Sequence, residues 1–132
     1  MAKESAVKIS AKKKKNATKT GAKYKYNNVL VEQRKDGITF LTLNRPEKRN
    51  AMSPELHHEM DDALERLAVD PDTKVLILTG AGKAFSAGQD LKTYFRGLSN
   101  DPVARSRAAA ASESWRSYRL IGFPKPTIAM VN

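Results

Sequence analysis

The sequence predicts an α/β fold in which a β-hairpin leads into a parallel sheet. Two strand-forming runs come first, and a helix, a strand, a further helical region and a last strand follow them. Strands that alternate with helices in this way favour parallel pairing, because each helix carries the chain back across the sheet. At 132 residues the chain has about the length of a single domain, so we expect one hydrophobic core.

The first element is a β-hairpin. Its strands are the apolar, β-branched runs Val29–Val31 and Ile38–Leu43. Between them, Asp36 and Gly37 form a dipeptide that suits a type I′ turn, in which both central residues need a positive φ. The sequence therefore predicts two antiparallel strands joined by a tight turn.

A helix is predicted from residue 54 to 68, and a strand follows it. Ser53 supplies an N-cap hydroxyl, and Pro54 suits the first helical position. Apolar residues then recur at helical spacing, namely Leu56, Met60, Ala63, Leu64 and Leu67. The Asp70-Pro71-Asp72 turn ends the helix, and the apolar run Val75–Thr79 predicts a strand that is covered on both faces.

The second half of the chain predicts two more helices and a last strand. A short helix begins near Leu91, and a longer alanine-rich helix spans about 103–120, with Trp115 available to the core. The run Thr127–Val131 is strand-forming. A buried parallel strand so close to Asn132 has no following helix to cover it, so we expect an incomplete domain.

Positive charge is concentrated at the start of the chain. The net charge is +10, of which residues 1–25 contribute +8 through nine lysines and one glutamate. Residues 1–26 hold few bulky apolar side chains, so we expect a disordered basic tail ahead of a globular part at 27–132. The run Lys12–Lys15 could bind nucleic acid or act as a nuclear address, and a tail without function is an equal alternative. Because residues 1–25 contain no arginine, a mitochondrial presequence fits them less well.

Composition excludes several kinds of protein and site. The chain has no cysteine, which excludes disulfides, cysteine-ligated zinc, iron–sulfur clusters and a cysteine nucleophile. It has no long apolar run and no secretory signal, so we expect a soluble protein without membrane contact, cytoplasmic by default. His57 and His58 are adjacent on the predicted helix and cannot chelate one metal together. We expect them to be surface or half-buried histidines, and we expect no metal site.

The glycine-bearing stretch from 80 to 91 carries the main signs of chemistry. Ser86 lacks the glycine pattern of a nucleophile elbow and has no histidine after it, which argues against a serine hydrolase. The run Gly80–Lys83 lacks the spacing of a phosphate-binding P-loop. The run Ala87–Leu91 is a tight loop that enters a helix, where free backbone N–H groups can hold an anion or a developing oxyanion. A plain turn capped by Asp90 is the alternative.

Three segments of the chain resemble the enoyl-CoA hydratase/isomerase (crotonase) superfamily. They are Leu43–Met52, Ala87–Leu91 with the strand and loop before it, and Lys125–Asn132, in the family's order and spacing. Within the superfamily, Arg45–Pro54, Leu91–Arg96 and Ser112–Trp115 look most like the hydroxycinnamoyl-CoA (feruloyl-CoA) hydratase-lyases. The resemblance covers about residues 27–132 and implies the N-terminal part of a crotonase-like ββα spiral fold.

The resemblance implies an enzyme that acts on a coenzyme A thioester and needs no separate cofactor. Its oxyanion hole would polarise the thioester carbonyl with two backbone N–H groups, one of them from Gln89, whose side chain would be incidental. Gly88 would let the backbone approach the substrate closely. The coenzyme A arm would lie against Lys48, Arg49, Ala51, Ser86, Ala87, Gly88, Gln89, Asp90 and Leu91, with Lys48 or Arg49 near its phosphates. Tyr94 matches a tyrosine that helps hold the phenolic hydroxyl of the substrate in the lyases, and packing in the core is the alternative.

The resemblance also implies a reaction. A hydratase-lyase adds water across the side-chain double bond of feruloyl-CoA or p-coumaroyl-CoA and then cleaves the product to an aromatic aldehyde and acetyl-CoA. The family takes its second oxyanion N–H from a glycine-rich segment directly after the position of Asn132, and its acid/base glutamate lies further on. Neither is among these 132 residues, so we expect the activity in a longer form, as a trimer or hexamer, and not in this chain alone.

Two alternatives remain at this point. A general enoyl-CoA hydratase would also use a coenzyme A thioester but would prefer aliphatic substrates. A non-catalytic fragment could instead act as an interaction module or bind polyanions such as nucleic acid through its lysine tail.

Overall fold

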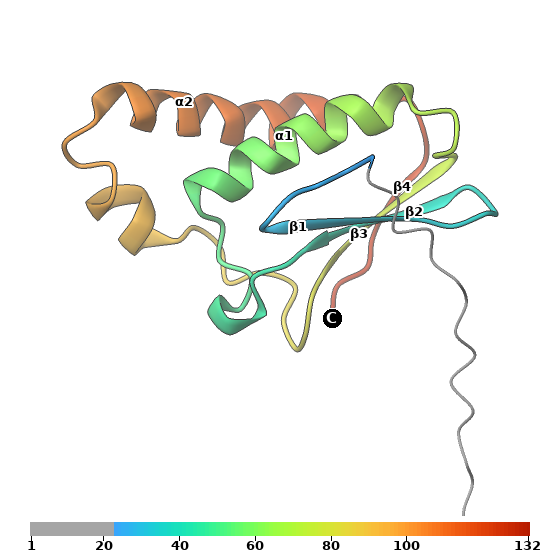
Figure 1. Ribbon diagram of the computed structural model, residues 1–132, viewed down its shortest axis with the longest axis horizontal. Coiled ribbons are helices and arrows are strands. Elements are labelled where there is room, and N and C mark those ends of the chain that lie inside the picture. Colours follow the sequence, from blue (N-terminus) through green and yellow to red (C-terminus); the bar gives the residue numbers. More distant parts are fainter. Residues whose placement is uncertain (1–22) are drawn as a thin grey trace, which may run out of the picture.

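The computed structural model describes residues 23–132, which form a four-stranded sheet with helices above it (Figure 1). The elements, in chain order, are β1 (Val29–Gln33), β2 (Ile38–Leu43), the 3₁₀ turn η1 (Pro46–Lys48), α1 (Pro54–Val69), β3 (Val75–Gly80), the π-helical η2 (Lys92–Arg96), α2 (Pro102–Glu113), the π-helical η3 (Ser114–Arg119) and β4 (Thr127–Ala129). The Lys12–Lys15 run of the predicted tail lies outside the described residues. None of the described helices is both long enough and apolar enough to span a membrane.

The sheet confirms the predicted topology. Its strand order is β1-β2-β3-β4, with β1 antiparallel to β2 and the other pairs parallel. The register of β2 and β3 places Leu43 opposite Gly80, the last residue of each strand. Because the two strands are parallel and end together, the loops that follow them start at the same edge of the sheet.

The hydrophobic core lies between the sheet and α1. The predicted apolar stripe of the helix meets the inward side chains of the strands, and α2 lies on the same face of the sheet (Figure 1). The buried apolar residues are Val29, Leu41, Leu43, Leu56, Met60, Ala63, Leu64, Leu67, Leu76, Leu78 and Trp115. The expectation that β3 is covered on both faces is wrong for the described part of the chain. Val75 and Ile77 point to the other face and stay half-buried, because α1 and α2 both lie on the opposite side of the sheet.

Two local features differ from the prediction. Gly37 has a φ of +86° but Asp36 has no positive φ, so the hairpin turn is not of type I′. The Gly37 N–H instead donates to the Arg34 carbonyl at 3.1 Å, and the Arg34 N–H donates to the Ile38 carbonyl at 2.9 Å. These two bonds close a longer loop with one left-handed glycine. The predicted helix at 103–120 changes at Ser114 from α-helical to π-helical turns.

Residues 23–26, assigned to the tail from the sequence, contact the folded part. The Lys23 ammonium lies 2.6 Å from the buried carboxylate of Asp70, and the Tyr24 hydroxyl donates to the same carboxylate. Burial raises the pKa of Asp70, but its hydrogen bonds, led by that from Lys23, outweigh burial and hold the pKa well below its usual value. The Tyr26 hydroxyl donates to Asp62 at 2.5 Å, and burial together with this bond raises the pKa of Tyr26 to about 12. Residues 23, 24 and 26 therefore pack against the folded part of the chain.

Candidate functional site

Two loops come together at the edge of the sheet where β2 and β3 end. The first loop spans residues 44–53 and the second residues 81–91, and Met52 and Gln89 form an isolated parallel bridge between them. Besides the side-chain bonds of Arg45 and Asn50, four hydrogen bonds join the loops: Ala87 N–H to Arg49 O at 2.8 Å, Ser86 Oγ to Asn50 O at 2.9 Å, Met52 N–H to Gly88 O at 2.8 Å, and Asp90 N–H to Met52 O at 2.9 Å. The carboxyl ends of parallel strands are the usual place for a ligand site in α/β sheets.

Asn50 is the central support of the two loops. It is fully buried and has a left-handed backbone with a φ of +55°, which asparagine tolerates better than most residues. Its side-chain oxygen accepts from the Arg45 N–H at 2.9 Å, and its amide nitrogen donates to the carbonyls of Ala81 at 2.9 Å and Ala84 at 2.7 Å. One side chain therefore satisfies polar groups from both loops that would otherwise be unpaired.

An ion pair adds a second support. The Arg45 guanidinium lies 3.0 Å from the Asp90 carboxylate and also donates to the Ala51 carbonyl, and both charged side chains are largely buried. Burial raises the pKa of Asp90, but hydrogen bonds from Thr93 and Arg45 together outweigh it and leave the pKa below its usual value. Asp90 also accepts from the Thr93 N–H, so the expected role of Asp90 as a cap of the following helical segment is compatible with its place in the site.

The Gln89 backbone N–H is free. The bridge to Met52 uses the groups on either side of Gln89, since Met52 donates to the Gly88 carbonyl and accepts from the Asp90 N–H. The Ala87 and Gly88 N–H groups are also bonded, to Arg49 O and to Ser86 Oγ. Among residues 87–90, Gln89 alone has an N–H that no hydrogen bond of the described chain uses. Because Met52 bonds to the residues before and after Gln89, the N–H of Gln89 itself points away from Met52. This donor is therefore directed outward from the two loops.

The Gln89 side chain is part of a buried chain of hydrogen bonds. His57 of α1 is fully buried; its Nε2 lies 3.0 Å from the Gln89 Oε1, and its Nδ1 accepts from the indole N–H of Trp115 at 3.0 Å. The expectation of a surface or half-buried histidine is wrong for His57, because α1 turns this residue toward the second loop and η3. The Gln89 side chain, expected to be incidental to the oxyanion hole, is thus held by a hydrogen bond. Burial lowers the pKa of His57 and outweighs the opposing bond to Gln89, and this lowered pKa favours the neutral ring.

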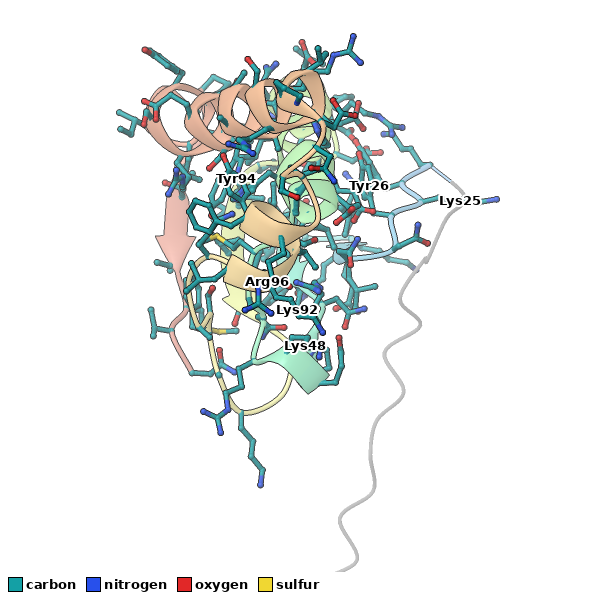
Figure 2. The ribbon with its side chains drawn as sticks, turned by 90° about the vertical axis from the view of Figure 1, so that its left-hand side faces the viewer. Lys25, Tyr26, Lys48, Lys92, Tyr94 and Arg96 are labelled. Carbon is teal, nitrogen blue, oxygen red and sulfur yellow. The ribbon has the colours of Figure 1, made fainter. Side chains whose placement is uncertain are left out.

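Tyr94 lies beside this chain of hydrogen bonds. Its ring packs edge-on against His57, with ring centroids 6.3 Å apart, and it is partly buried. Its hydroxyl makes no hydrogen bond within the described residues, so the packing alternative accounts for the ring and leaves the hydroxyl available. Figure 2 shows Tyr94 on the same side of the molecule as the labelled side chains of Lys48, Lys92 and Arg96.

The structure brings most of the candidate residues together. The bonds between the loops hold Arg49, Ser86, Ala87, Gly88, Gln89 and Asp90 in one cluster, with Ala51 tied to it by Arg45. Lys48 and Leu91 lie at its exposed margin. Gly88 has a φ of +87°, and a Cβ there would meet no atom within 4 Å, so the surface beside it is open.

Five residues of the site were not predicted as site residues. His57 and Trp115 lie 32 residues before and 26 residues after Gln89, and no local pattern signals such a contact. Arg45, Asn50 and Met52 belong to a segment that carries the family resemblance but were not given a role. A depression lined by 24–26 and 29–32 lies along β1 and contains none of the candidate residues. Within residues 23–132, no three histidine, aspartate or glutamate side chains come together as a metal site requires.

Comparisons with known proteins match most of the chain to one family. The model of the enoyl-CoA hydratase/isomerase family matches residues 33–132. The hydroxycinnamoyl-CoA hydratase-lyase of Pseudomonas fluorescens is 53% identical over 98 residues, which are 74% of this chain and 36% of that protein. The human enoyl-CoA delta isomerase 2 is 40% identical over 106 residues, which are 78% of this chain and 26% of that protein.

Solved structures give the same result. An enoyl-CoA hydratase/isomerase from Mycobacterium paratuberculosis is similar with a TM-score of 0.72 and 32% identity, over 83% of this chain and 43% of that one. An enoyl-CoA hydratase/isomerase from Xanthobacter autotrophicus has a TM-score of 0.69 and 35% identity, over 82% of this chain and 39% of that one. The chain thus spans less than half the length of the relatives it matches. The matches confirm the predicted crotonase-like α/β fold, and the chain belongs to the enoyl-CoA hydratase/isomerase family.

Proposed function

We propose that the protein binds an acyl-CoA thioester and that the Gln89 N–H donates a hydrogen bond to the thioester carbonyl oxygen. The observation that carries this proposal is the free N–H of Gln89, which lies in the run 87–90, where the other three N–H groups are bonded. A backbone donor fixed in this way needs little reorganisation when negative charge develops on the carbonyl oxygen. Membership in the enoyl-CoA hydratase/isomerase family supports a thioester as the ligand.

The coenzyme A arm would lie along the two joined loops. The open surface at Gly88 leaves room for a ligand beside the backbone. Lys48 and Arg49 are exposed and form no ion pair with another described residue, so their charges are available to phosphate groups. The remaining cradle would be formed by Ala51 and the run Ser86–Leu91.

We assign the protein to the hydratase-lyases, with feruloyl-CoA or p-coumaroyl-CoA as substrate. Water adds across the double bond to give a β-hydroxy thioester. The hydroxyl then loses its proton, the bond between the α and β carbons breaks, and its electron pair passes to the thioester as an enolate. Protonation of the enolate gives acetyl-CoA, and the other product is an aromatic aldehyde. The 53% identity with the Pseudomonas fluorescens lyase supports this assignment.

The proposed reaction needs further groups besides the Gln89 N–H. By resemblance to the family, the second oxyanion donor and the acid/base glutamate would follow Asn132. Assembly into a trimer or hexamer is proposed on the same basis, and the native mass of the protein in solution checks it. Tyr94 would contact the phenolic hydroxyl of the substrate. Its own hydroxyl is unbonded in the described chain, and its ring packs against His57, which bonds to Gln89.

The test is product analysis with the protein expressed from its complete coding sequence. We expect feruloyl-CoA to give the aldehyde and acetyl-CoA in equal amounts. Tyr94→Phe should lower kcat/KM for feruloyl-CoA relative to crotonyl-CoA by about threefold to tenfold, the effect of one neutral hydrogen bond. Tyr118→Phe is the control, because Tyr118 is 70% exposed on η3.

Each alternative has its own outcome. Turnover of crotonyl-CoA without aldehyde from feruloyl-CoA would replace the lyase by a general hydratase. An unchanged substrate ratio in Tyr94→Phe would remove the phenol contact. No binding of any acyl-CoA would overturn the thioester site.

A further inference from the structure

Trp115, His57 and Gln89 form a hydrogen-bonded chain that links three elements, which we call the Trp115–His57–Gln89 chain. Trp115 comes from η3, His57 from α1, and Gln89 from the loop that holds the free N–H. The histidine is fully buried and the tryptophan is 5% exposed. A buried polar chain of this kind is costly unless its members are satisfied, and here each bond has a length of 3.0 Å.

The donors and acceptors of this chain are fixed by chemistry. The tryptophan indole nitrogen can only donate, so the His57 Nδ1 must be an acceptor without a proton. A neutral imidazole then carries its proton on Nε2, which donates to the Gln89 Oε1. The ring therefore has one tautomer, and that tautomer orients the glutamine carboxamide with its oxygen toward α1.

This orientation leaves one group without a partner. The Gln89 Nε2 is buried and makes no hydrogen bond within the described chain. Reversing the carboxamide would turn this nitrogen toward His57, where two N–H donors would face each other. The carboxamide oxygen therefore faces His57, and the nitrogen stays without a partner among the described residues.

The direction of the Gln89 N–H depends on the peptide plane that it shares with the Gly88 carbonyl. The Gln89 N–H belongs to the peptide plane that follows Gly88, and glycine permits rotation of that plane at little cost. Met52 holds the carbonyl of the same plane and the N–H of Asp90. The bond from His57 to the Gln89 side chain is a third contact, beside these two from Met52, that helps to fix the direction of the free N–H.

We propose that His57 is a positioning residue, which holds the Gln89 side chain through its Nε2–H and thereby aims the Gln89 backbone N–H at the thioester carbonyl. This inference rests on the proposed thioester site. His57 touches no substrate in this account, and its contribution passes entirely through Gln89. Trp115 fixes the tautomer that makes the contribution possible.

Two substitutions of equal length separate positioning from packing. His57→Gln keeps an N–H donor near the position of Nε2, whereas His57→Met fills a similar volume without a donor. A role in packing alone would affect both variants alike. A role through the hydrogen bond would be rescued by glutamine and not by methionine.

The test measures the affinity of the protein from the complete coding sequence for two probes, butyryl-CoA and its thioether analogue S-butyl-CoA. The probes differ only in the carbonyl that the Gln89 N–H would bind, so the ratio of their dissociation constants reports on that donor. We expect the preference for the thioester to fall about threefold to tenfold in His57→Met, the effect of one neutral hydrogen bond. His57→Gln should keep most of the preference.

The outcomes distinguish this inference from the proposed function. If wild-type protein binds neither probe, or binds both equally, the thioester site is wrong and the inference fails with it. If wild-type protein prefers the thioester and His57→Met keeps that preference, His57 has no positioning role. Should His57→Met fail to fold, nitrogen NMR of wild-type protein decides, because a proton on Nδ1 of His57 would overturn the inference and a proton on Nε2 would support it.

Discussion

Two glycines at the site are required for different physical reasons. At Gly80 an added Cβ would lie 2.4 Å from the carbonyl oxygens of both Ala84 and Phe85, so the loop after β3 can cross its strand end only over a glycine. At Gly88 the space is open, and the requirement is the left-handed φ of +87°. The first glycine excludes a side chain by contact, and the second by backbone conformation.

This difference predicts unequal effects of alanine. Gly80→Ala should lower the free energy of unfolding by about 3 kcal/mol or more, because backbone atoms must move. Gly88→Ala should cost about 1–2 kcal/mol, the strain of a left-handed alanine. Urea unfolding of the two variants measures this, and equal losses would contradict the crowded geometry at Gly80.

At the scale of the element, local signals predicted well what depends on neighbouring residues. The α1 helix begins at Pro54 as expected, and the Ser53 Oγ accepts from the Leu56 N–H at 3.3 Å. Caps and helical periodicity are short-range, so a single sequence contains them. The hairpin turn was less predictable, because Asp36-Gly37 fits more than one loop geometry and the register of the whole sheet selects among them.

The cap predicts a measurable loss of stability. Ser53→Ala should lower the free energy of unfolding by about 1 kcal/mol, because one N–H of the first helical turn loses its partner. Ser99→Ala is the control, since the Ser99 hydroxyl is exposed and bonds only to the Arg96 carbonyl. Thermal or urea unfolding compares the two, and equal effects would show that the cap contributes nothing specific.

In the candidate site too, the residues that short-range signals mark were predictable, and the contacts that depend on packing were not. The loop residues from Lys48 to Leu91 could be named from motifs that resemble a family, because those motifs are contiguous. The contact of His57 with Gln89 could not, since it joins residues 32 positions apart and depends on how α1 packs against the sheet. The change to π-helical turns at Ser114, next to Trp115, depends on tertiary packing in the same way.

At the scale of the whole molecule, the buried titratable groups set how stability depends on pH. The pKa of His57 is lowered on folding, because burial disfavours the charged ring. The unfolded chain then binds a proton as pH falls below about 6.5 while the folded chain does not, so stability is full above that pH and declines below it. Asp70 and Asp90 have lowered pKa values in the folded state, so their contribution is present above about pH 4 and is lost on further acidification.

These two pH ranges can be separated by one variant. His57→Gln should remove the decline in the free energy of unfolding that begins below about pH 6.5 and leave the loss below about pH 4. Urea unfolding across this range gives both slopes. An unchanged decline just below about pH 6.5 would mean that the folded protein accommodates a charged His57.

In the proposed thioester site, the sheet edge after β2 and β3 presents the Gln89 N–H to the carbonyl oxygen. The most direct measurement follows the backbone amide signal of Gln89 by NMR while butyryl-CoA or S-butyl-CoA is added to the protein expressed from its complete coding sequence. We predict that the thioester shifts the Gln89 amide proton downfield, as a new hydrogen bond does, and that the thioether leaves this proton nearly unmoved. If the Gln89 amide responds equally to both probes, or to neither while other amides respond, the claim is wrong.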